Sequence, residues 1–450
     1  MKIHFIGIGG IGISALAKYY LYNGYQISGS DVSYPNVFTE KELSKIKFYL
    51  GHKASNLAKD IDLVIYSNAI EATNPELLKA KKLKIKTLSY PQALGNLTKQ
   101  HFTIAIAGMH GKSTTTAMIA RILINASLDP YVIIGSKVKG FGINGEASNF
   151  RLGSSKFLII EADEYKRGFL YHYPDILLIT NIEEEHLDCY KNLDDIKETF
   201  KKFILRLTLK NRSDELNKFS KYLVYNKDNK ELFNLVKDNK NLFKRMGIKI
   251  KTYSIKNRPD KLKLKIPGLH NVSNAIGALK VAEILKIPNK ISIKSLNEFE
   301  GIWRRLEFKG YLNGAKIFDD YGHHPTEVKA TLKATRELIK NGRLFIVFQP
   351  HQYHRTFSLF DKFINAFDEA DVVVITDIYS VAGREKESIK KKINSEILIN
   401  EIKKHKENVF YMRNFEDIKK FLKENLKKGD ICIIMGAGDI WKLTNLLINN

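Results

Sequence analysis

The chain has 450 residues, of which 44% are hydrophobic, 11% are aromatic and 10 are proline. At roughly 100–200 residues per domain this length gives several domains and a substantial core, and the composition excludes disordered, fibrous and miniprotein classes. Lysine and arginine number 73 against 49 aspartates and glutamates, a formal net charge of +24. That charge is compatible with an anionic partner, namely nucleic acid, a membrane surface or a phosphorylated small molecule. We interpret it as a solvated basic surface, because no basic block is interleaved with aromatic residues as in single-strand binders.

Two further features concern the compartment. Cys189 and Cys432 cannot form a metal cluster by themselves and show no disulfide framework, which fits a reducing cytoplasm. The apolar run after Lys2 looks like a short signal peptide, but a phosphate-binding turn explains its repeated glycines better. No stretch reaches the ~18 apolar residues of a membrane span. We therefore expect a soluble cytoplasmic protein with no membrane and no nucleic-acid partner.

The first hundred residues are predicted to form one small α/β unit. Short β-branched runs predict strands, and apolar residues at helical spacing predict a helix between the first two. The predicted elements are a strand at 2–8, a helix at 9–25, strands at 26–31 and 62–70, and a closing segment at 86–97.

Two further α/β units follow. The second has strands at 102–108, 157–163 and 176–183, a helix at 109–126, and a polar segment at 208–262 that we place in surface strands and loops. The third has strands at 316–322, 343–350, 371–379 and 430–439. Short crossover connections favour largely parallel sheets. The predicted domains are 1–99, Rossmann-like; 100–305, a central P-loop ATPase-type parallel sheet; and 306–450, again Rossmann-like.

The first motif is G-x-G-x-x-G at 7–12, between a strand and a helix, with Asp31 at the end of the second strand. Glycines let the backbone approach a phosphate, the helix start supplies N–H groups, and the acid can accept from a ribose hydroxyl. The pattern is typical of dinucleotide binding, but a nucleotide sugar has the same pyrophosphate and ribose. The alternative without a ligand is a tight strand–helix turn.

The second motif is Gly108-Met109-His110-Gly111-Lys112-Ser113-Thr114. Gly-Lys-Ser at a helix start predicts a P-loop, in which N–H groups hold phosphate oxygens, Lys112 neutralises the β/γ charge and Ser113 can hold Mg²⁺. Ile106 stands where the common spacing has its first glycine, so the loop must be tighter. An ordinary turn before a capped helix is the alternative.

Acidic residues follow two strands, at Glu161–Glu164 and Glu183–Glu185. Ligands in open parallel sheets bind beyond the carboxyl ends of strands, so these carboxylates are predicted to face the P-loop. One carboxylate with Ser113 and the phosphates of ATP would suffice for Mg²⁺, with His186 as an unusual addition. A solvated acidic face is the alternative for the 183–185 triplet.

Four further segments carry polar groups that fit a site. Asn271 and Asn274 either cap a helix or face an adenine edge. Arg304 and Arg305 suit a phosphate or structural ion pairs. Histidines and an arginine concentrate at two strand ends, 319–326 and 350–356, which favours a site over a core.

Together these motifs resemble the Mur ligases of bacterial cell-wall synthesis, over nearly the whole chain. The segments that carry the resemblance, in the family's order, are HFIGIGGIGISALA (4–17), SGSD (28–31), AIAGMHGKSTTT (105–116), IIEADE (159–164), TNIEEEHLD (180–188), HNVSNAIGA (270–278), GIWRRLE (301–307), DDYGHHPTE (319–327) and FQPHQYHRT (348–356).

The resemblance implies an ATP-dependent amide ligation in which L-alanine is joined to the lactyl carboxylate of UDP-N-acetylmuramate through an acyl phosphate. Such a ligase serves peptidoglycan precursor synthesis, and thereby cell shape and division. The implied cofactors are ATP and Mg²⁺. The implied substrate-binding residues are Gly9, Gly10, Gly12, Asp31, Ser67 and Arg355. The implied ATP-binding residues are Gly108, His110, Gly111, Lys112, Ser113, Thr114, Asn271, Asn274 and Arg305. The implied metal ligands are Ser113, Glu161 and His186, and the implied catalytic residues are Lys112, His186, Asp320, His323 and Arg355.

The chain departs from the family pattern at 165–168 and at Gln352, where an arginine is usual. Alanine, glycine, serine or a preassembled peptide, as in a recycling ligase, therefore stay open as the group that is joined. A carbamylated lysine, as in some relatives, would be Lys201 or Lys202, and we do not predict one. The alternatives from other classes are a nicotinamide-dependent oxidoreductase and a nucleic-acid-stimulated ATPase.

Overall fold

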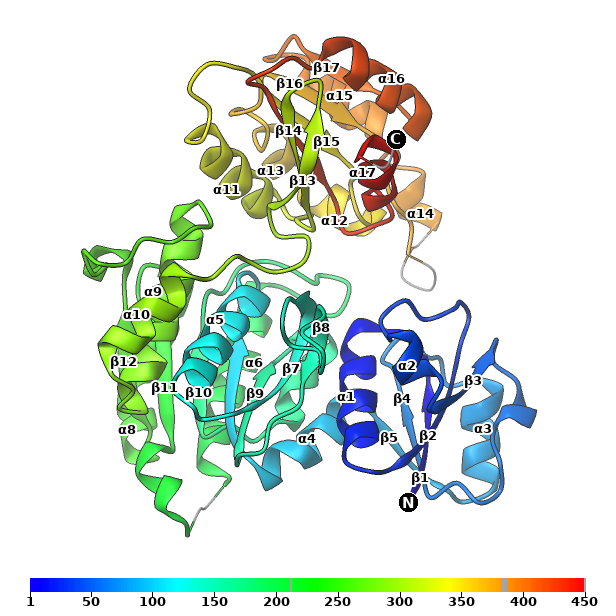
Figure 1. Cartoon of the computed structure of the whole chain (residues 1–450), viewed down its shortest axis with the longest axis vertical. Coiled ribbons are helices and arrows are strands. Elements are labelled where there is room, and N and C mark those ends of the chain that lie inside the picture. Colours follow the sequence, from blue (N-terminus) through cyan, green and yellow to red (C-terminus); the bar gives the residue numbers. More distant parts are fainter. Residues whose placement is uncertain (211–212, 382–384, 386, 449–450) are drawn as a thin grey trace. The chain divides into compact units, whose positions relative to one another are not determined.

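A computed structural model describes residues 1–210, 213–381, 385 and 387–448, which form two compact units. The first unit comprises Met1–Glu183, Leu193–Lys263 and Ser273–Phe299, and the second Glu184–Asn192, Leu264–Val272 and Glu300–Asn450. The predicted α/β class with three mostly parallel sheets is confirmed (Figure 1). The predicted domain boundaries stay a prediction. In the described part of the chain, every helix is too short or too polar to cross a membrane.

The first sheet has five parallel strands in the order β3-β2-β1-β4-β5. Their bounds are β1 Lys2–Ile6, β2 Gln26–Asp31, β3 Ile46–Leu50, β4 Leu63–Tyr66 and β5 Lys86–Ser89. The helices are α1 Ile11–Tyr22, α2 Glu40–Leu43, α3 Pro75–Lys82 and α4 Tyr90–Gln100, with a 3₁₀ turn at Ala54–Asn56. The predicted strand at 62–70 is too long, because the chain turns back where Ile70 N donates to the Ser67 carbonyl. The order reverses between β1 and β4, so the glycine turn after β1 lies at the switch point where ligands bind in open parallel sheets.

The second sheet has seven strands in the order β12-β11-β10-β6-β9-β7-β8, and only β7 and β8 pair antiparallel. Their bounds are β6 Phe102–Ala107, β7 Tyr131–Val138, β8 Ser148–Arg151, β9 Phe157–Glu161, β10 Ile176–Ile179, β11 Tyr222–Asn226 and β12 Lys249–Tyr253. The helices are α5 Lys112–Asn125, α6 Leu193–Leu205, α7 Lys230–Asp238, α8 Lys240–Arg245, α9 Leu269–Ile284 and α10 Asn289–Asn297. The short 3₁₀ elements are η2 Tyr165–Tyr171, η3 Arg206–Thr208, η4 Glu215–Phe219 and η5 Ile255–Asn257.

The prediction of surface strands and loops at 208–262 is wrong for much of this segment. β11 is an inner strand of the sheet with Leu223 and Val224 fully buried, and α7 buries Leu232. The polar residues that suggested a surface are exposed on α7 and α8, on the edge strand β12 and between the elements. Residues 211–212 lie outside the described residues.

The third sheet has six strands in the order β13-β14-β18-β15-β16-β17, with β13 antiparallel to β14. Their bounds are β13 Glu307–Leu312, β14 Ala315–Asp320, β15 Leu344–Phe348, β16 Val372–Ile375, β17 Val409–Tyr411 and β18 Ile431–Met435. The helices are α11 Pro325–Arg336, α12 Tyr353–Ser358, α13 Phe360–Ile364, α14 Glu387–Lys390, α15 Ser395–Ile402, α16 Phe415–Asn425 and α17 Trp441–Ile448. Separate apolar clusters cover the two faces of the sheet, as expected when helices lie on both sides.

Helix α1 is tied to the β7–β8 pair by buried polar contacts within the first unit. The Lys18 ammonium, 2% exposed, lies 3.1 Å from a Glu42 carboxylate oxygen, 2.8 Å from the Val37 carbonyl and 3.3 Å from Ser148 Oγ. The Asn149 amide donates to the Ile11 carbonyl at 2.5 Å and to Ser14 Oγ at 2.8 Å. We call these contacts the α1–β8 interlock. They fix the start of α1, where the first glycine motif lies, to the second sheet.

Replacing Lys18 with methionine is expected to destabilise the first unit strongly. The substitution leaves the buried carboxylate of Glu42 without its cation, which typically costs about 3 kcal/mol or more of folding free energy. Urea unfolding followed by circular dichroism measures this. Lys2→Met is the control, because the ion pair of Lys2 with Asp60 is exposed. Equal urea midpoints for Lys18→Met and Lys2→Met would show that the buried Lys18–Glu42 pair adds no more to the folding free energy than an exposed ion pair does.

Candidate functional site

The turn after β1 has the geometry of a phosphate cradle. Gly7 has φ +78°, a left-handed conformation that favours glycine, and its N–H donates to the Ser30 carbonyl at 2.8 Å. Gly10 is the N-cap of helix α1 and supplies no side-chain cap, so the N–H groups of the first helical turn face the glycine turn. Ser67, at the end of β4, lies beside this turn, since a Cβ on Gly7 would come within 3.1 Å of the Ser67 Cβ. We call this turn with Ser67 the first cradle.

The side chains around the first cradle explain its other glycines. Asp31 Oδ2 accepts a hydrogen bond from Gly9 N at 2.8 Å, and a Cβ on Gly9 would lie 2.9 Å from the same oxygen. A Cβ on Gly12 would lie 3.1 Å from the Tyr90 hydroxyl oxygen. Asp31 therefore shapes the turn in addition to its predicted contact with a ribose. Tyr90 adds a hydroxyl to the edge of the cradle that sequence reasoning did not identify.

The predicted P-loop lies between β6 and α5 and is as tight as its shortened spacing predicts. Gly108 has φ +130°, and a Cβ there would lie 2.1 Å from Thr180 Oγ1. Gly111 has φ +80°, and a Cβ there would lie 2.5 Å from Asn274 Oδ1. The side chain of Asn181 holds the loop from the end of β10: its Oδ1 accepts from His110 N and its Nδ2 donates to the His110 carbonyl, both at 3.0 Å.

Two carboxylates at the end of β9 hold the polar side chains of the P-loop. The Lys112 ammonium lies 2.9 Å from Glu164 Oε1 and 2.7 Å from the Gly108 carbonyl. Ser113 Oγ donates to Glu161 Oε2 at 2.9 Å, and Gly135 N from β7 donates to the same oxygen at 2.8 Å. The structure thus brings together the predicted trio of Lys112, Ser113 and Glu161. Glu164 is an additional partner, and its place three residues after Glu161 was the available signal.

Charge is concentrated at this loop. Burial raises the pKa of Glu161, although Lys112 acts in the opposite direction. Burial would lower the pKa of Lys112, but the carboxylates of Glu164 and its neighbours raise it overall. Lys112 is therefore a permanent cation. A hydroxyl and a carboxylate 2.9 Å apart are oxygen donors of the kind that Mg²⁺ takes, and the uncapped start of α5 fits phosphate oxygens.

The second unit holds its own polar cluster at the ends of β14 and β15. Asp320 accepts from Leu306 N at 2.7 Å and Gly322 N at 2.6 Å, and burial raises its pKa to about 6. Arg305 donates to Glu327 at 3.0 Å, which fits the structural ion-pair alternative as well as the predicted phosphate contact. Burial and the charge of Arg355 lower the pKa of His323 to about 3, so this imidazole is neutral at physiological pH.

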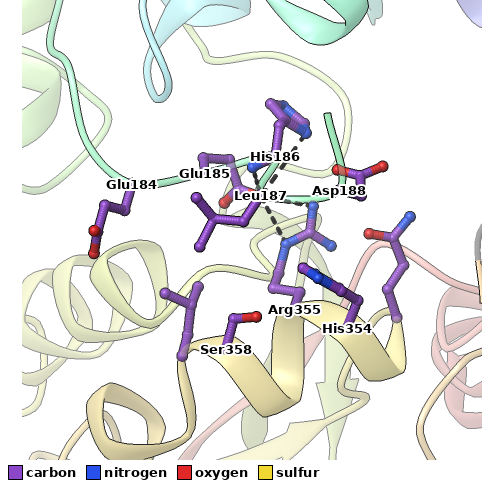
Figure 2. A pocket seen from close by; sticks show the side chains of 10 residues that line it. Glu184, Glu185, His186, Leu187, Asp188, His354, Arg355 and Ser358 are labelled. Atoms are coloured by element: carbon purple, nitrogen blue, oxygen red, sulfur yellow. Dashed lines mark hydrogen bonds and ion pairs between the residues drawn. The ribbon is translucent and has the colours of Figure 1, made fainter. Parts of the chain in front are cut away.

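Arg355 lies in a small pocket of the second unit where its partner is Glu185. Nε and a terminal nitrogen of Arg355 both lie 2.9 Å from Glu185 Oε1, as the dashed lines in Figure 2 show. Both side chains are buried, and Arg355 holds the pKa of the Glu185 carboxyl well below its usual range against the effect of burial. The pocket is lined by Glu184, Glu185, His186, Leu187, Asp188, Gln352, His354, Arg355, Ser358 and Leu359. The sequence did not predict this ion pair of Glu185. The alternative that residues 183–185 form a solvated acidic face is wrong for Glu185, because its side chain is buried.

The remaining predicted residues are placed as follows. Asn274 lies against Gly111 of the P-loop, whereas the amide of Asn271 donates to the Pro267 carbonyl at 2.7 Å. His186 has φ +55°, an uncommon conformation for a residue other than glycine. Thr114 is buried in the first turn of α5, and Lys201 pairs with Glu198 on α6. Apart from Lys201, for which no role is predicted, the roles of these residues stay predictions.

The chain belongs to the Mur ligase family. Three family models match it in succession: Mur ligase family, catalytic domain at residues 2–102; Mur ligase middle domain at 106–282; and Mur ligase, glutamate ligase domain at 304–438. The fold and the two glycine turns described above agree with this assignment.

Individual relatives cover the whole chain. The UDP-N-acetylmuramate–L-alanine ligase of Acetivibrio thermocellus is 39% identical, covering 100% of this chain and 96% of its own length. An enzyme of the same name from Clostridium botulinum is 40% identical, covering 99% and 97%. Among solved structures, the UDP-N-acetylmuramate-alanine ligase MurC of Thermotoga maritima is similar with a TM-score of 0.80 at 25% identity, covering 100% and 98%.

The raised pKa of Asp320 predicts a pH dependence of stability. The pKa of the Asp320 carboxyl is about 6 in the folded chain, against 3.8 for an ordinary aspartate in the unfolded chain. Between these two values the folded chain therefore binds more protons than the unfolded chain. The free energy of unfolding should therefore fall by about 3 kcal/mol as the pH rises from about 4 to about 6. Urea midpoints of the wild type and of Asp320→Asn across this range measure the difference. Parallel pH profiles for the two proteins would show that this carboxyl titrates normally.

Proposed function

We propose that the chain is an ATP-dependent ligase that joins L-alanine to the lactyl carboxylate of UDP-N-acetylmuramate and forms ADP and phosphate. The observation that carries this proposal is the 39% identity to a ligase of that name over the full length of both chains. The presence of two phosphate-type turns in one compact unit supports it, because the reaction needs two nucleotides at once. ATP and a UDP-sugar are cytoplasmic metabolites, so we propose that the reaction takes place in the cytoplasm.

In this proposal the first cradle binds the UDP moiety. Gly9, Gly10 and Gly12 receive the pyrophosphate at the start of α1, where the helix dipole favours negative charge. Asp31 accepts from the uridine ribose while it keeps the turn in shape through Gly9 N. Ser67 adds a hydroxyl on the other side of the turn.

The P-loop binds ATP through the residues that Glu161 and Glu164 now hold. Backbone N–H groups from Gly108 to Thr114, together with the side chain of His110, surround the β- and γ-phosphates. Lys112 exchanges Glu164 for phosphate oxygens, and Asn274 and Asn271 face the adenine. Ser113 and Glu161, with His186, would hold Mg²⁺, which when bound neutralises charge on the transferring phosphoryl group.

The proposed reaction has two steps. The lactyl carboxylate attacks the γ-phosphorus, the bond to the β-phosphate oxygen breaks, and an acyl phosphate and ADP result. Lys112 stabilises the charge on the transferring oxygens. The neutral amine of alanine then attacks the acyl carbon, loses a proton, and phosphate leaves. We propose that Asp320, His323 and Arg355 bind the amino acid, and that Arg305 contacts phosphate.

Replacing Lys112 with alanine should abolish turnover but spare uridine-nucleotide binding. The substitution removes the cation of the P-loop and leaves the first cradle unchanged. Phosphate release should fall by at least about 10³-fold, while the dissociation constant for UDP in calorimetry should change less than about twofold. Joint loss of both properties would show that the two nucleotides do not bind at separate turns.

The substrate assignment is tested by phosphate release from ATP. We expect phosphate release only when UDP-N-acetylmuramate and an amino acid are present together. A panel of alanine, glycine, serine and the recycling tripeptide then shows which of these acceptors the enzyme prefers. Stimulation by DNA or RNA, or binding of NADH without any response to ATP, would contradict the proposal and favour one of the two other classes.

A further inference from the structure

The segment after β9 adopts a strained backbone. Lys166 and Arg167, two consecutive residues of η2, have φ values of +49° and +59°. Such left-handed conformations cost non-glycine residues roughly 1–2 kcal/mol each. A chain keeps strain of this kind only where its surroundings enforce it, and such positions cluster at functional sites.

Arg167 and its neighbours supply that enforcement. One terminal nitrogen of Arg167 lies 3.0 and 2.9 Å from the two carboxylate oxygens of Asp195, and the other donates to Thr199 Oγ1 at 2.6 Å. Phe169 is fully buried, and its ring stacks on Phe203 at a centroid distance of 4.3 Å. These contacts fix the segment on α6 and leave the side chain of Lys166 outside the core.

The Lys166 ammonium lies beside the first cradle. It donates to the Asn68 carbonyl at 3.1 Å, and Asn68 directly follows Ser67. Lys166 is exposed, and this is the single hydrogen bond of its ammonium among the described residues. An ammonium has three N–H donors, so it can serve a further acceptor.

The same segment connects this lysine with the P-loop carboxylates. Lys166 follows Glu164, the partner of Lys112, by two residues, and follows Glu161, the partner of Ser113, by five. At the edge of η2, a Cβ on Gly168 would contact Pro91 at 3.2 Å and the Asp163 carbonyl at 3.4 Å. The start of α4, with Tyr90 against Gly12, therefore packs beside the end of β9.

The acidic side chains after β9 would repel the carboxylate of an incoming substrate. Glu161 and Glu164, which hold Ser113 and Lys112, and Asp163 between them place three acidic side chains directly after β9. A substrate carboxylate that approaches the P-loop from the first cradle meets this negative charge. Lys166 belongs to the segment that directly follows Glu164, and its ammonium lies beside the first cradle, so its positive charge opposes that repulsion.

We propose that Lys166 binds the lactyl carboxylate of UDP-N-acetylmuramate and positions it for attack on the γ-phosphate. This inference rests on the proposed function and assigns a substrate contact to a residue that the family pattern did not predict. Because the lysine binds the group that reacts, it is a positioning residue for the first step. The pyrophosphate, the other anion of the same substrate, is the alternative ligand of this ammonium.

The test compares two ligands that differ in the lactyl group. For Lys166→Met we expect the dissociation constant of UDP-N-acetylmuramate to rise at least about 10-fold, whereas that of UDP-N-acetylglucosamine, which lacks the carboxylate, should change less than about twofold. Calorimetry with each ligand measures both. Lys166→Arg should recover most of the affinity. Lys249→Met is the matched control, because the ammonium of Lys249 also donates to a backbone carbonyl at 3.1 Å but on β12.

Two outcomes would overturn the inference. Equal weakening for both ligands would assign Lys166 to the pyrophosphate, and unchanged affinity for both would leave it with no substrate contact. The KM for UDP-N-acetylmuramate in wild-type and Lys166→Met enzyme gives a second measure, with saturating ATP and alanine. A wild-type enzyme that releases no phosphate with these substrates would contradict the proposed function itself, which separates that failure from failure of the lysine's role.

Discussion

The attachment of α1 to the β7–β8 pair is the constraint on which the rest of the first unit depends. Helix α1 begins at the first cradle, and β7 supplies the N–H of Gly135 that donates to Glu161 beside the P-loop. The α1–β8 interlock, with Lys18 paired to Glu42 and Asn149 bonded to the first turn of α1, connects the two. A buried ion pair adds little net stability, yet it is costly to break. The pair therefore serves to fix one arrangement of the two turns.

Both turns follow from the same topology. In a parallel sheet the connections after the strands meet at one edge, and a tight glycine turn there directs the start of a helix at an anion. The P-loop adds charged side chains that hold one another: Glu164 holds Lys112, and Glu161 holds Ser113. A phosphate that binds Lys112 takes the place of the Glu164 carboxylate. Because Glu164 already holds the ammonium at the loop, Lys112 is oriented before the phosphate binds.

The sequence predicted the parts of the structure that local rules determine. The glycine turns and β2 follow from residue types at fixed spacing, whereas the choice of Glu161 beside Ser113 came from the resemblance to the family. The antiparallel β8 and the inner strand β11 were not predicted, because their identity depends on which strands they pair with. The Glu185–Arg355 pair joins residues 170 positions apart, and one sequence contains no signal for such a contact. Lys166 lies in the segment that departs from the family pattern, and the sequence alone predicts no role for it, because its left-handed backbone is visible only in three dimensions.

Isotope transfer tests most directly whether the two turns bring a carboxylate to the terminal phosphoryl group. UDP-N-acetylmuramate labelled with ¹⁸O in both lactyl carboxylate oxygens is incubated with ATP, L-alanine and the enzyme, and the released phosphate is analysed by mass spectrometry. Attack of the carboxylate on the γ-phosphorus predicts one labelled oxygen in each phosphate released, with the other retained in the amide product. Unlabelled phosphate would contradict this, because it would mean that water, and not the substrate carboxylate, receives the phosphoryl group.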